Sequence, residues 1–163
     1  MTAHTGRAAH SHVALYAAFV NAVVIFFLSL YPFTGWAYSG RPLFEFLSYP
    51  LPYYTRFFDN AANLLIYVPY GFSLALLLMP RWLSFVLALL LCLLTSITVE
   101  FLQEFLPMRV ASNLDVLCNV AGGVLGAILA VSPLFRRRMH QLRQWRRRHF
   151  AEHSAVDYGL LLL

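Results

Sequence analysis

The sequence predicts an all-α membrane protein, a bundle of four transmembrane helices followed by a basic amphipathic C-terminal tail. Of the 163 residues, 60% are hydrophobic and only 12% are charged, and the mean hydropathy is +0.65. A soluble domain of this length needs more charge to cover its surface. Four apolar stretches reach about 20 residues, the length of helix that crosses a hydrocarbon core of about 30 Å. The composition therefore favours a membrane protein.

The first predicted span covers residues 13–31 and follows an N-terminal tail, residues 1–12. A secretory signal peptide is the alternative, because the stretch is N-terminal and Arg7 precedes it. However, the apolar run is longer than the core of an ordinary signal peptide, and no convincing cleavage site between small residues follows it. We therefore predict a retained helix.

Residues 32–59 form the longest predicted loop. Its prolines interrupt helices, and its Trp and Tyr rings are of the type that settles at the level of the lipid headgroups. We expect this loop to lie on the membrane surface.

The remaining three spans are predicted at residues 60–79, 82–106 and 113–135. Short turns, one at Pro80-Arg81 and one at 107–109, join them, so neighbouring helices must be antiparallel. Pro69 interrupts the second span, and a kink is expected there. Residues 13–135 thus form one transmembrane domain.

The basic residues are concentrated in residues 136–163, the predicted cytoplasmic tail. Residues 1–135 hold five Arg and five acids, whereas residues 136–148 hold seven Arg. Arg next to the last span favours a cytoplasmic end, which predicts an N-in/C-in topology with the 32–59 loop outside. We expect the tail to form an amphipathic helix on anionic phospholipids. Nucleic acid is not an expected partner, because no nucleic-acid-binding fold accompanies the Arg run.

Polar residues of three spans should converge at the outer end of the bundle. They are Asp59, Asn63, Glu100, Gln103, Arg109, Asp115 and Asn119. A charge at the centre of a bilayer costs about 2.5–3.5 kcal/mol on insertion scales. Glu100, placed below its helix end, should therefore be paired, hydrated or protonated.

Helical phase places these residues on packed faces. Asp115, Asn119, Gly122 and Gly126 follow one stripe of the fourth span. Gly122 and Gly126 form a GxxxG pair, which permits close approach of helices within the bundle or in a dimer.

No metal or cofactor is predicted. Cys92 and Cys118 lie in apolar spans without a CxxC pattern, and the histidines lie in the two tails.

The joint spacing of these residues resembles the VanZ-like family of bacterial membrane proteins. Asp59-x3-Asn63-x5-Pro69-x-Gly71 is similar to a first motif of that family. Glu100-x2-Gln103-x3-Pro107-x-Arg109 and Asp115-x3-Asn119-x2-Gly122-x3-Gly126 are similar to a second. The resemblance implies a multi-pass protein of the bacterial inner membrane with a role in the cell envelope. The founding member is associated with low-level resistance to teicoplanin, a lipid-tailed glycopeptide, and the resemblance implies no reaction.

Three functions fit the polar residues. The first is binding or translocation of a lipid-linked or amphiphilic envelope molecule by Arg109, Asp59, Asn63, Gln103 and Asn119. The second is an enzyme that uses Glu100 and Asp115 as acid and base on an envelope lipid, with Arg109 holding a phosphate or carboxylate. The third is a scaffold in which interhelical hydrogen bonds only hold the bundle together. Pro69, Gly71, Gly122 and Gly126 are assigned structural roles.

Overall fold

The computed structural model describes residues 3–51, 57–78 and 81–150, which are helical apart from their connections. The helices are α1 (Ala3–Leu30), α2 (Phe57–Leu77), α3 (Arg81–Gln103), α4 (Asn113–Val131) and α5 (Pro133–Phe150), and a short 3-10 helix, η1, covers Glu45–Ser48. Within these ranges there is no β-strand. The predicted all-α class is therefore confirmed.

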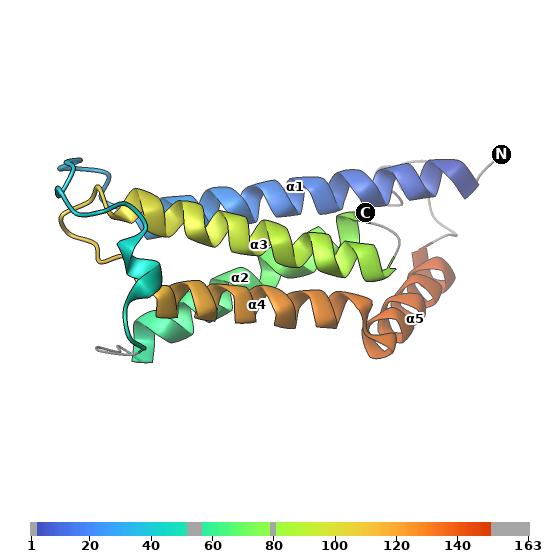
Figure 1. The fold of residues 1–163 in the computed structure, drawn as a ribbon. Helices are drawn as coiled ribbons and strands as arrows, with labels where there is room; N and C mark the ends of the chain where they lie inside the picture. The colour runs from blue at the N-terminus through green and yellow to red at the C-terminus, as the bar shows by residue number, and fades with distance from the viewer. Residues whose placement is uncertain (1–2, 52–56, 79–80, 151–163) are drawn as a thin grey trace.

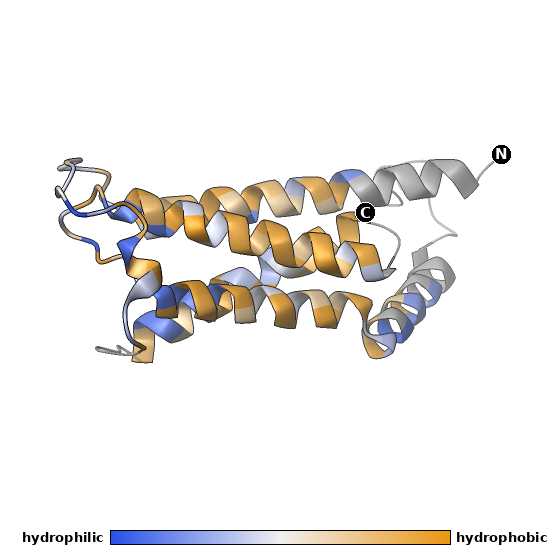
Figure 2. Cartoon of the chain, in the orientation of Figure 1, coloured by the Kyte–Doolittle hydropathy of each residue, from blue (hydrophilic) through white to orange (hydrophobic). Residues whose placement is uncertain are grey.

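Four helices are long and apolar enough to cross a membrane. The candidate spans are His12–Leu30, Phe57–Leu77, Trp82–Gln103 and Asn113–Val131. They lie side by side in a bundle, and apolar residues cover most of their length (Figures 1 and 2). We call the end at which α1 and α3 finish and α2 and α4 begin the loop end, because the segment 31–51 lies there.

Several helix boundaries differ from the sequence prediction. Helix α2 begins at Phe57, inside the predicted 32–59 loop, and helix α3 ends at Gln103, before the predicted end at 106. Helix α1 begins at Ala3 and so includes most of the segment that was expected to be a tail. Helix α4 ends at Val131, earlier than the predicted end at 135, because Ser132 adopts an extended conformation (φ −64°, ψ 140°). Pro133 follows, and proline disfavours a helical conformation in the preceding residue but fits the first position of a helix.

Helices α2 and α4 make the most extensive helix contact, and glycines permit it. A Cβ atom at Gly122 would overlap the carbonyl oxygen of Leu64, and one at Gly126 would overlap that of Val68. Gly71 of α2 in turn lies against the backbone of Gly123. The GxxxG pair therefore serves packing within the chain, as small residues do between membrane helices.

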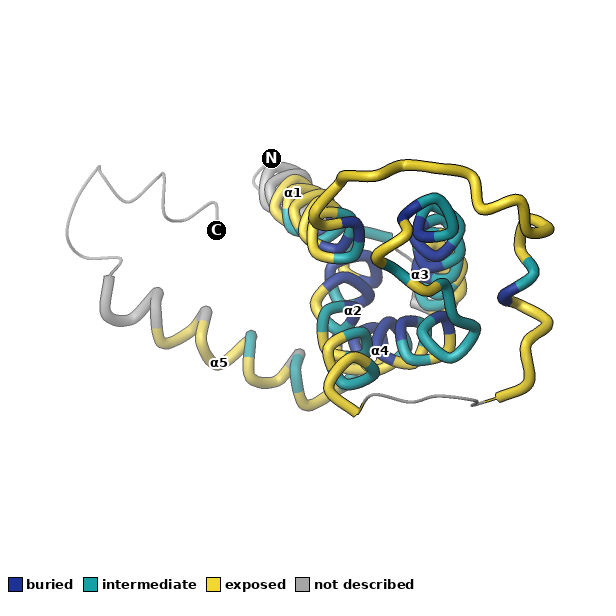
Figure 3. The backbone as a smooth tube through the Cα atoms, turned by 90° about the vertical axis from the view of Figure 1, so that its left-hand side faces the viewer, coloured by how far each residue is buried: buried dark blue, intermediate teal, exposed yellow. Residues whose placement is uncertain are grey.

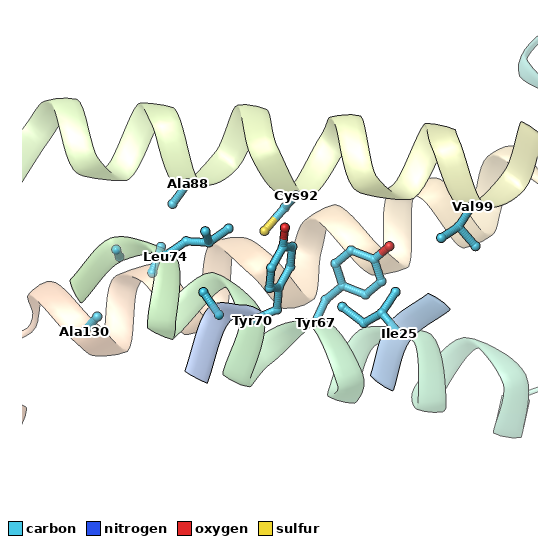
Figure 4. Close-up of a cluster of buried hydrophobic side chains, with 11 residues drawn as sticks. Ile25, Tyr67, Tyr70, Leu74, Ala88, Cys92, Val99 and Ala130 are labelled. Atoms are coloured by element: carbon cyan, nitrogen blue, oxygen red, sulfur yellow. The ribbon is translucent and has the colours of Figure 1, made fainter. Parts of the chain in front are cut away.

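The core contains two tyrosines toward the loop end and mostly small apolar residues farther from it. Tyr67 and Tyr70 of α2 project toward α3, with Ile25 and Val99 nearby (Figure 4). Away from the loop end, the core consists of small apolar residues and one leucine: Leu74, Ala75, Ala88, Ala127 and Ala130. Among the described residues of that half, the buried polar side chains are those of Ser73 and Ser84. The Ser73 hydroxyl donates to the Pro69 carbonyl in its own helix, at 2.7 Å.

Candidate functional site

The loop end gathers the seven polar residues that the sequence singled out. Asp59 lies in the first turn of α2 and Asp115 in the first turn of α4. Glu100 and Gln103 lie in the last turn of α3, and hydrophilic residues mark this end in Figure 2. The antiparallel order of the helices brings these residues together, because α3 ends at the loop end and α2 and α4 begin there.

Glu100 holds the beginning of α4. Its side chain is only 2% exposed, and its Oε2 accepts a hydrogen bond from the backbone N–H of Ser112 at 2.9 Å. Ser112 is the N-cap residue of α4, and its Oγ accepts from the N–H of Leu114 at 3.2 Å. Because the first N–H groups of a helix have no partner inside the helix, the carboxyl oxygen of Glu100 at this position supplies one.

Asp115 and Asn63 connect α4 to α2. The Asn63 side chain forms a hydrogen bond with the Asp115 carboxyl group, and Asp59 lies within electrostatic range of the same carboxyl group. Asp115 is also within electrostatic range of Glu100. Asn63 and Asp115 are half-buried and Asp59 is exposed. We call Asp59, Asn63, Glu100 and Asp115 the acid–amide cluster.

The acid–amide cluster does not form a metal site of the usual kind. Over the described part of the chain, no three His, Cys, Asp or Glu side chains are grouped closely enough to hold a metal ion.

Gln103 and Arg109 contact the last carbonyl groups of α1. Gln103 Nε2 donates to the Ser29 carbonyl at 3.0 Å. Arg109 Nη2 donates to the Leu28 and Tyr31 carbonyls at 3.0 and 2.9 Å, and Arg109 Nε donates to Tyr31 at 3.2 Å. Because the last four carbonyls of a helix have no partner within the helix, these side chains cap α1. Ligand binding by Gln103 and Arg109 stays a prediction beside this structural role.

Asn119 continues the polar residues into the bundle. Its Nδ2 donates to Ser96 Oγ at 3.0 Å, and both side chains are buried. Deeper still, the hydroxyls of Tyr70 and Thr95 form a hydrogen bond of 3.0 Å. We call Glu100, Ser96, Asn119, Tyr67, Tyr70 and Thr95 the polar column. Tyr67 and Thr95 were not singled out by the sequence, although Tyr67 lies one turn after Asn63 on the same face of α2.

The segment 31–51 is fixed to the loop end of α3 and α4. The Ala37 N–H donates to the Phe105 carbonyl at 2.9 Å, and the Phe44 ring stacks on Phe101 with centroids 4.9 Å apart. Asn113 Nδ2 donates to the Tyr49 carbonyl at 2.6 Å. The segment still exposes apolar and aromatic side chains, among them Trp36, Tyr38, Leu43 and Leu47. Its expected position on the membrane surface stays a prediction.

Comparison with known families matches the model described as VanZ/LLP1 to residues 13–136. The matched range contains the acid–amide cluster, the polar column and both capping side chains. No curated protein and no solved structure gives a significant match.

Proposed function

Because the chain belongs to the VanZ/LLP1 family and has four helices able to span a membrane, we propose that it binds the polar head of an amphiphilic cell-envelope molecule. The binding site is the acid–amide cluster, on the extracytoplasmic face of the bacterial inner membrane. The seven Arg that follow α4 support this orientation, since basic residues accumulate on the cytoplasmic side.

The observation that carries the proposal is that the exposure of the described polar residues falls from the acid–amide cluster at the loop end to Ser96, Glu100 and Asn119 of the polar column. Asp59 is exposed and Asn63 and Asp115 are half-buried, whereas Ser96, Glu100 and Asn119 are buried. Beyond Tyr70, the described core holds no buried charge and no fully buried amide. Leu74 and four alanines fill most of it, beside Ser73, Ser84 and the half-buried Asn21 amide, which lies 3.5 Å from Ser73 Oγ. A polar headgroup crossing this region would lose its hydrogen bonds, which is costly in an apolar environment. Binding at one face is therefore favoured over translocation.

The composition of the site indicates the chemistry of the ligand. Carboxyl oxygens accept hydrogen bonds, so they suit hydroxyl or ammonium groups. The guanidinium group of Arg109 donates three hydrogen bonds, one to the Leu28 carbonyl of α1 and two to the Tyr31 carbonyl just after it, which reduces its capacity for a phosphate. We therefore expect a headgroup that carries sugar hydroxyls or an amine. Its attached apolar chain would lie in the bilayer, against the exposed apolar side chains of the helices.

An experiment with the purified chain in nanodiscs tests the proposal. Native mass spectrometry would measure binding of a monoglucosyl diacylglycerol and of phosphatidylethanolamine, with phosphatidylglycerol for comparison. Each hydrogen bond to a charged group contributes about 1.5–3 kcal/mol, so Asp59→Asn combined with Asp115→Asn should weaken binding of at least one of the first two lipids about tenfold or more. Glu45→Gln, a carboxylate of η1 outside the cluster, should leave binding unchanged.

The same experiment separates the other two functions. If the folded double variant binds both lipids as the wild type does, or if neither lipid binds, the scaffold hypothesis replaces the proposal. If the wild type converts a lipid to a product and Glu100→Gln does not, the acid–base hypothesis for Glu100 and Asp115 replaces it.

A further inference from the structure

Within the described residues, two buried side-chain polar atoms in the middle of the bundle have no hydrogen-bond partner. They are the hydroxyl oxygen of Tyr67 and the amide oxygen Oδ1 of Asn119. The two side chains are only 1% and 2% exposed. Leaving one such group unpaired costs about 1–3 kcal/mol, and buried polar groups in native proteins are satisfied by protein or by ordered water.

Both side chains lie beside Ser96, from opposite helices. Asn119 reaches Ser96 from α4 through its Nδ2, at 3.0 Å. The Tyr67 hydroxyl approaches Ser96 and Glu100 from α2, and its ring projects toward α3 (Figure 4). Although Tyr67 is close enough to Ser96 to interact with it, the geometry does not place its hydroxyl in a hydrogen bond.

The two atoms are complementary in chemistry. The Tyr67 hydroxyl is a donor as well as an acceptor, whereas Asn119 Oδ1 is an acceptor only. A water molecule can accept from the first and donate to the second, and it has a further donor and acceptor for Ser96 or Glu100. A buried water typically makes about three hydrogen bonds of this kind.

We infer that the polar column contains a bound water molecule that links Tyr67 of α2 to Asn119 of α4 beside Ser96. The water is a structural part of the bundle and does not depend on the ligand proposed for the acid–amide cluster. It joins the three helices that carry the polar column, at a level between Glu100 and Tyr70.

The first test measures the water directly in the wild-type chain in lipid bilayers. Water-edited solid-state NMR with labelled tyrosine and asparagine should show magnetisation transfer from bound water to the Tyr67 ring and the Asn119 side chain. Ala88, which is fully buried among the small apolar residues away from the loop end, is the internal reference and should show none. Absence of transfer to both polar residues, or a direct Tyr67–Ser96 hydrogen bond in its place, would overturn the inference.

The change in melting temperature caused by Tyr67→Phe is an independent test, because its sign depends on whether the hydroxyl has a partner. Tyr67→Phe removes the donor, so it should lower the melting temperature by about 2–4 °C if the hydroxyl holds a water. An unpartnered hydroxyl would give the opposite sign, because its removal relieves a buried unsatisfied group. In Asn119→Leu, which removes the acceptor, the additional loss caused by Tyr67→Phe should disappear. A rise in melting temperature, or the same loss in both backgrounds, contradicts the bridge.

Helix α5 carries a second, independent inference. It starts at the corner Ser132-Pro133, where the apolar span of α4 ends, and it runs sideways from the bundle when viewed along the helix axes (Figure 3). The Phe135 ring packs edge-on against Phe72, with centroids 4.9 Å apart, and fixes the corner. A helix leaving at this point lies near the membrane–water boundary.

The surface of α5 combines exposed apolar and exposed basic side chains. Leu134 is 74% exposed and Trp145 is 53% exposed, and Arg137 and Arg138 are exposed as well. Residues 133–150 hold seven Arg and no acid. We propose that α5 lies on the membrane surface and binds the headgroups of anionic phospholipids, since apolar burial and Arg–lipid attraction act together there.

Trp145 fluorescence tests this surface in the full chain, in a Trp36→Phe, Trp82→Phe background. The emission should shift to the blue in nanodiscs that contain phosphatidylglycerol, relative to phosphatidylcholine alone. Replacing Arg137 and Arg138 with Gln should reduce the shift, whereas Arg41→Gln in the loop should not. An equal spectrum in both lipids contradicts the proposal, and a shift caused by DNA in phosphatidylcholine nanodiscs would assign the surface to nucleic acid instead.

Discussion

Gly126→Val is expected to destabilise the bundle strongly. Even the Cβ atom of the new side chain would overlap the Val68 carbonyl oxygen and come within 2.7 Å of the Phe72 backbone nitrogen. Backbone atoms cannot rotate away as a flexible side chain can, so α2 and α4 must separate. Overpacking of a core costs about 1–3 kcal/mol and occasionally more, and here we expect a loss of about 3 kcal/mol or more.

The matched control is Ala121→Val, which adds apolar volume to the same helix at an exposed position. Both variants would be measured by steric trapping in bicelles, with the melting temperature in detergent as a second readout. Ala121→Val should stay within about 0.5 kcal/mol of the wild type, as surface substitutions usually do. Equal stability of the two valine variants would show that close α2–α4 packing does not hold the bundle together.

Glu100→Ala is expected to have the second largest effect. The substitution leaves the Ser112 N–H without its side-chain acceptor at a buried position and opens a cavity at the start of α4. An unpaired buried donor costs about 1–3 kcal/mol, and large-to-small core substitutions cost about 2–5 kcal/mol. We expect a total loss of about 3 kcal/mol in the free energy of unfolding.

Glu100→Gln is the informative comparison, because its side-chain oxygen can still accept the Ser112 N–H while its charge is gone. A small loss of unfolding free energy in Glu100→Gln and a large loss in Glu100→Ala would show that Glu100 acts as a hydrogen-bond acceptor for the α4 N-terminus. If Gln is as destabilising as Ala, the negative charge itself is required at the helix dipole. If neither variant is less stable than the wild type, the contact with Ser112 does not stabilise the fold.

The helices and their order could be predicted from the sequence because local patterns determine them. Apolar runs of membrane-spanning length mark the four spans, and the short turns force antiparallel neighbours. That order alone places Asp59, Glu100 and Asp115 at the same end. The stripe through Gly122 and Gly126 likewise predicted a packed face. It did not say whether the partner was α2 or a second molecule, because a glycine pair fits either.

The partners of Gln103 and Arg109 could not be predicted in this way. Both donate to main-chain carbonyls of α1, and a carbonyl group is the same in every residue, so no sequence pattern marks it. An Arg beside acids suggested an anion ligand, whereas the structure shows it capping a helix. The break at Ser132 was accessible in principle, since Pro133 follows it, but the continuous hydrophobicity across 113–135 outweighed that signal.

The capping of α1 also constrains how the chain matures in the bilayer. Arg109 comes 78 residues after Tyr31 and 81 after Leu28, and Gln103 comes 74 after Ser29. While the ribosome is still making the second crossing, the trailing carbonyls of the first must remain hydrated at the interface. They acquire their final partners only after the third crossing has been synthesised and has docked. The first helix is thus completed late in biogenesis, by residues that belong to another part of the polypeptide.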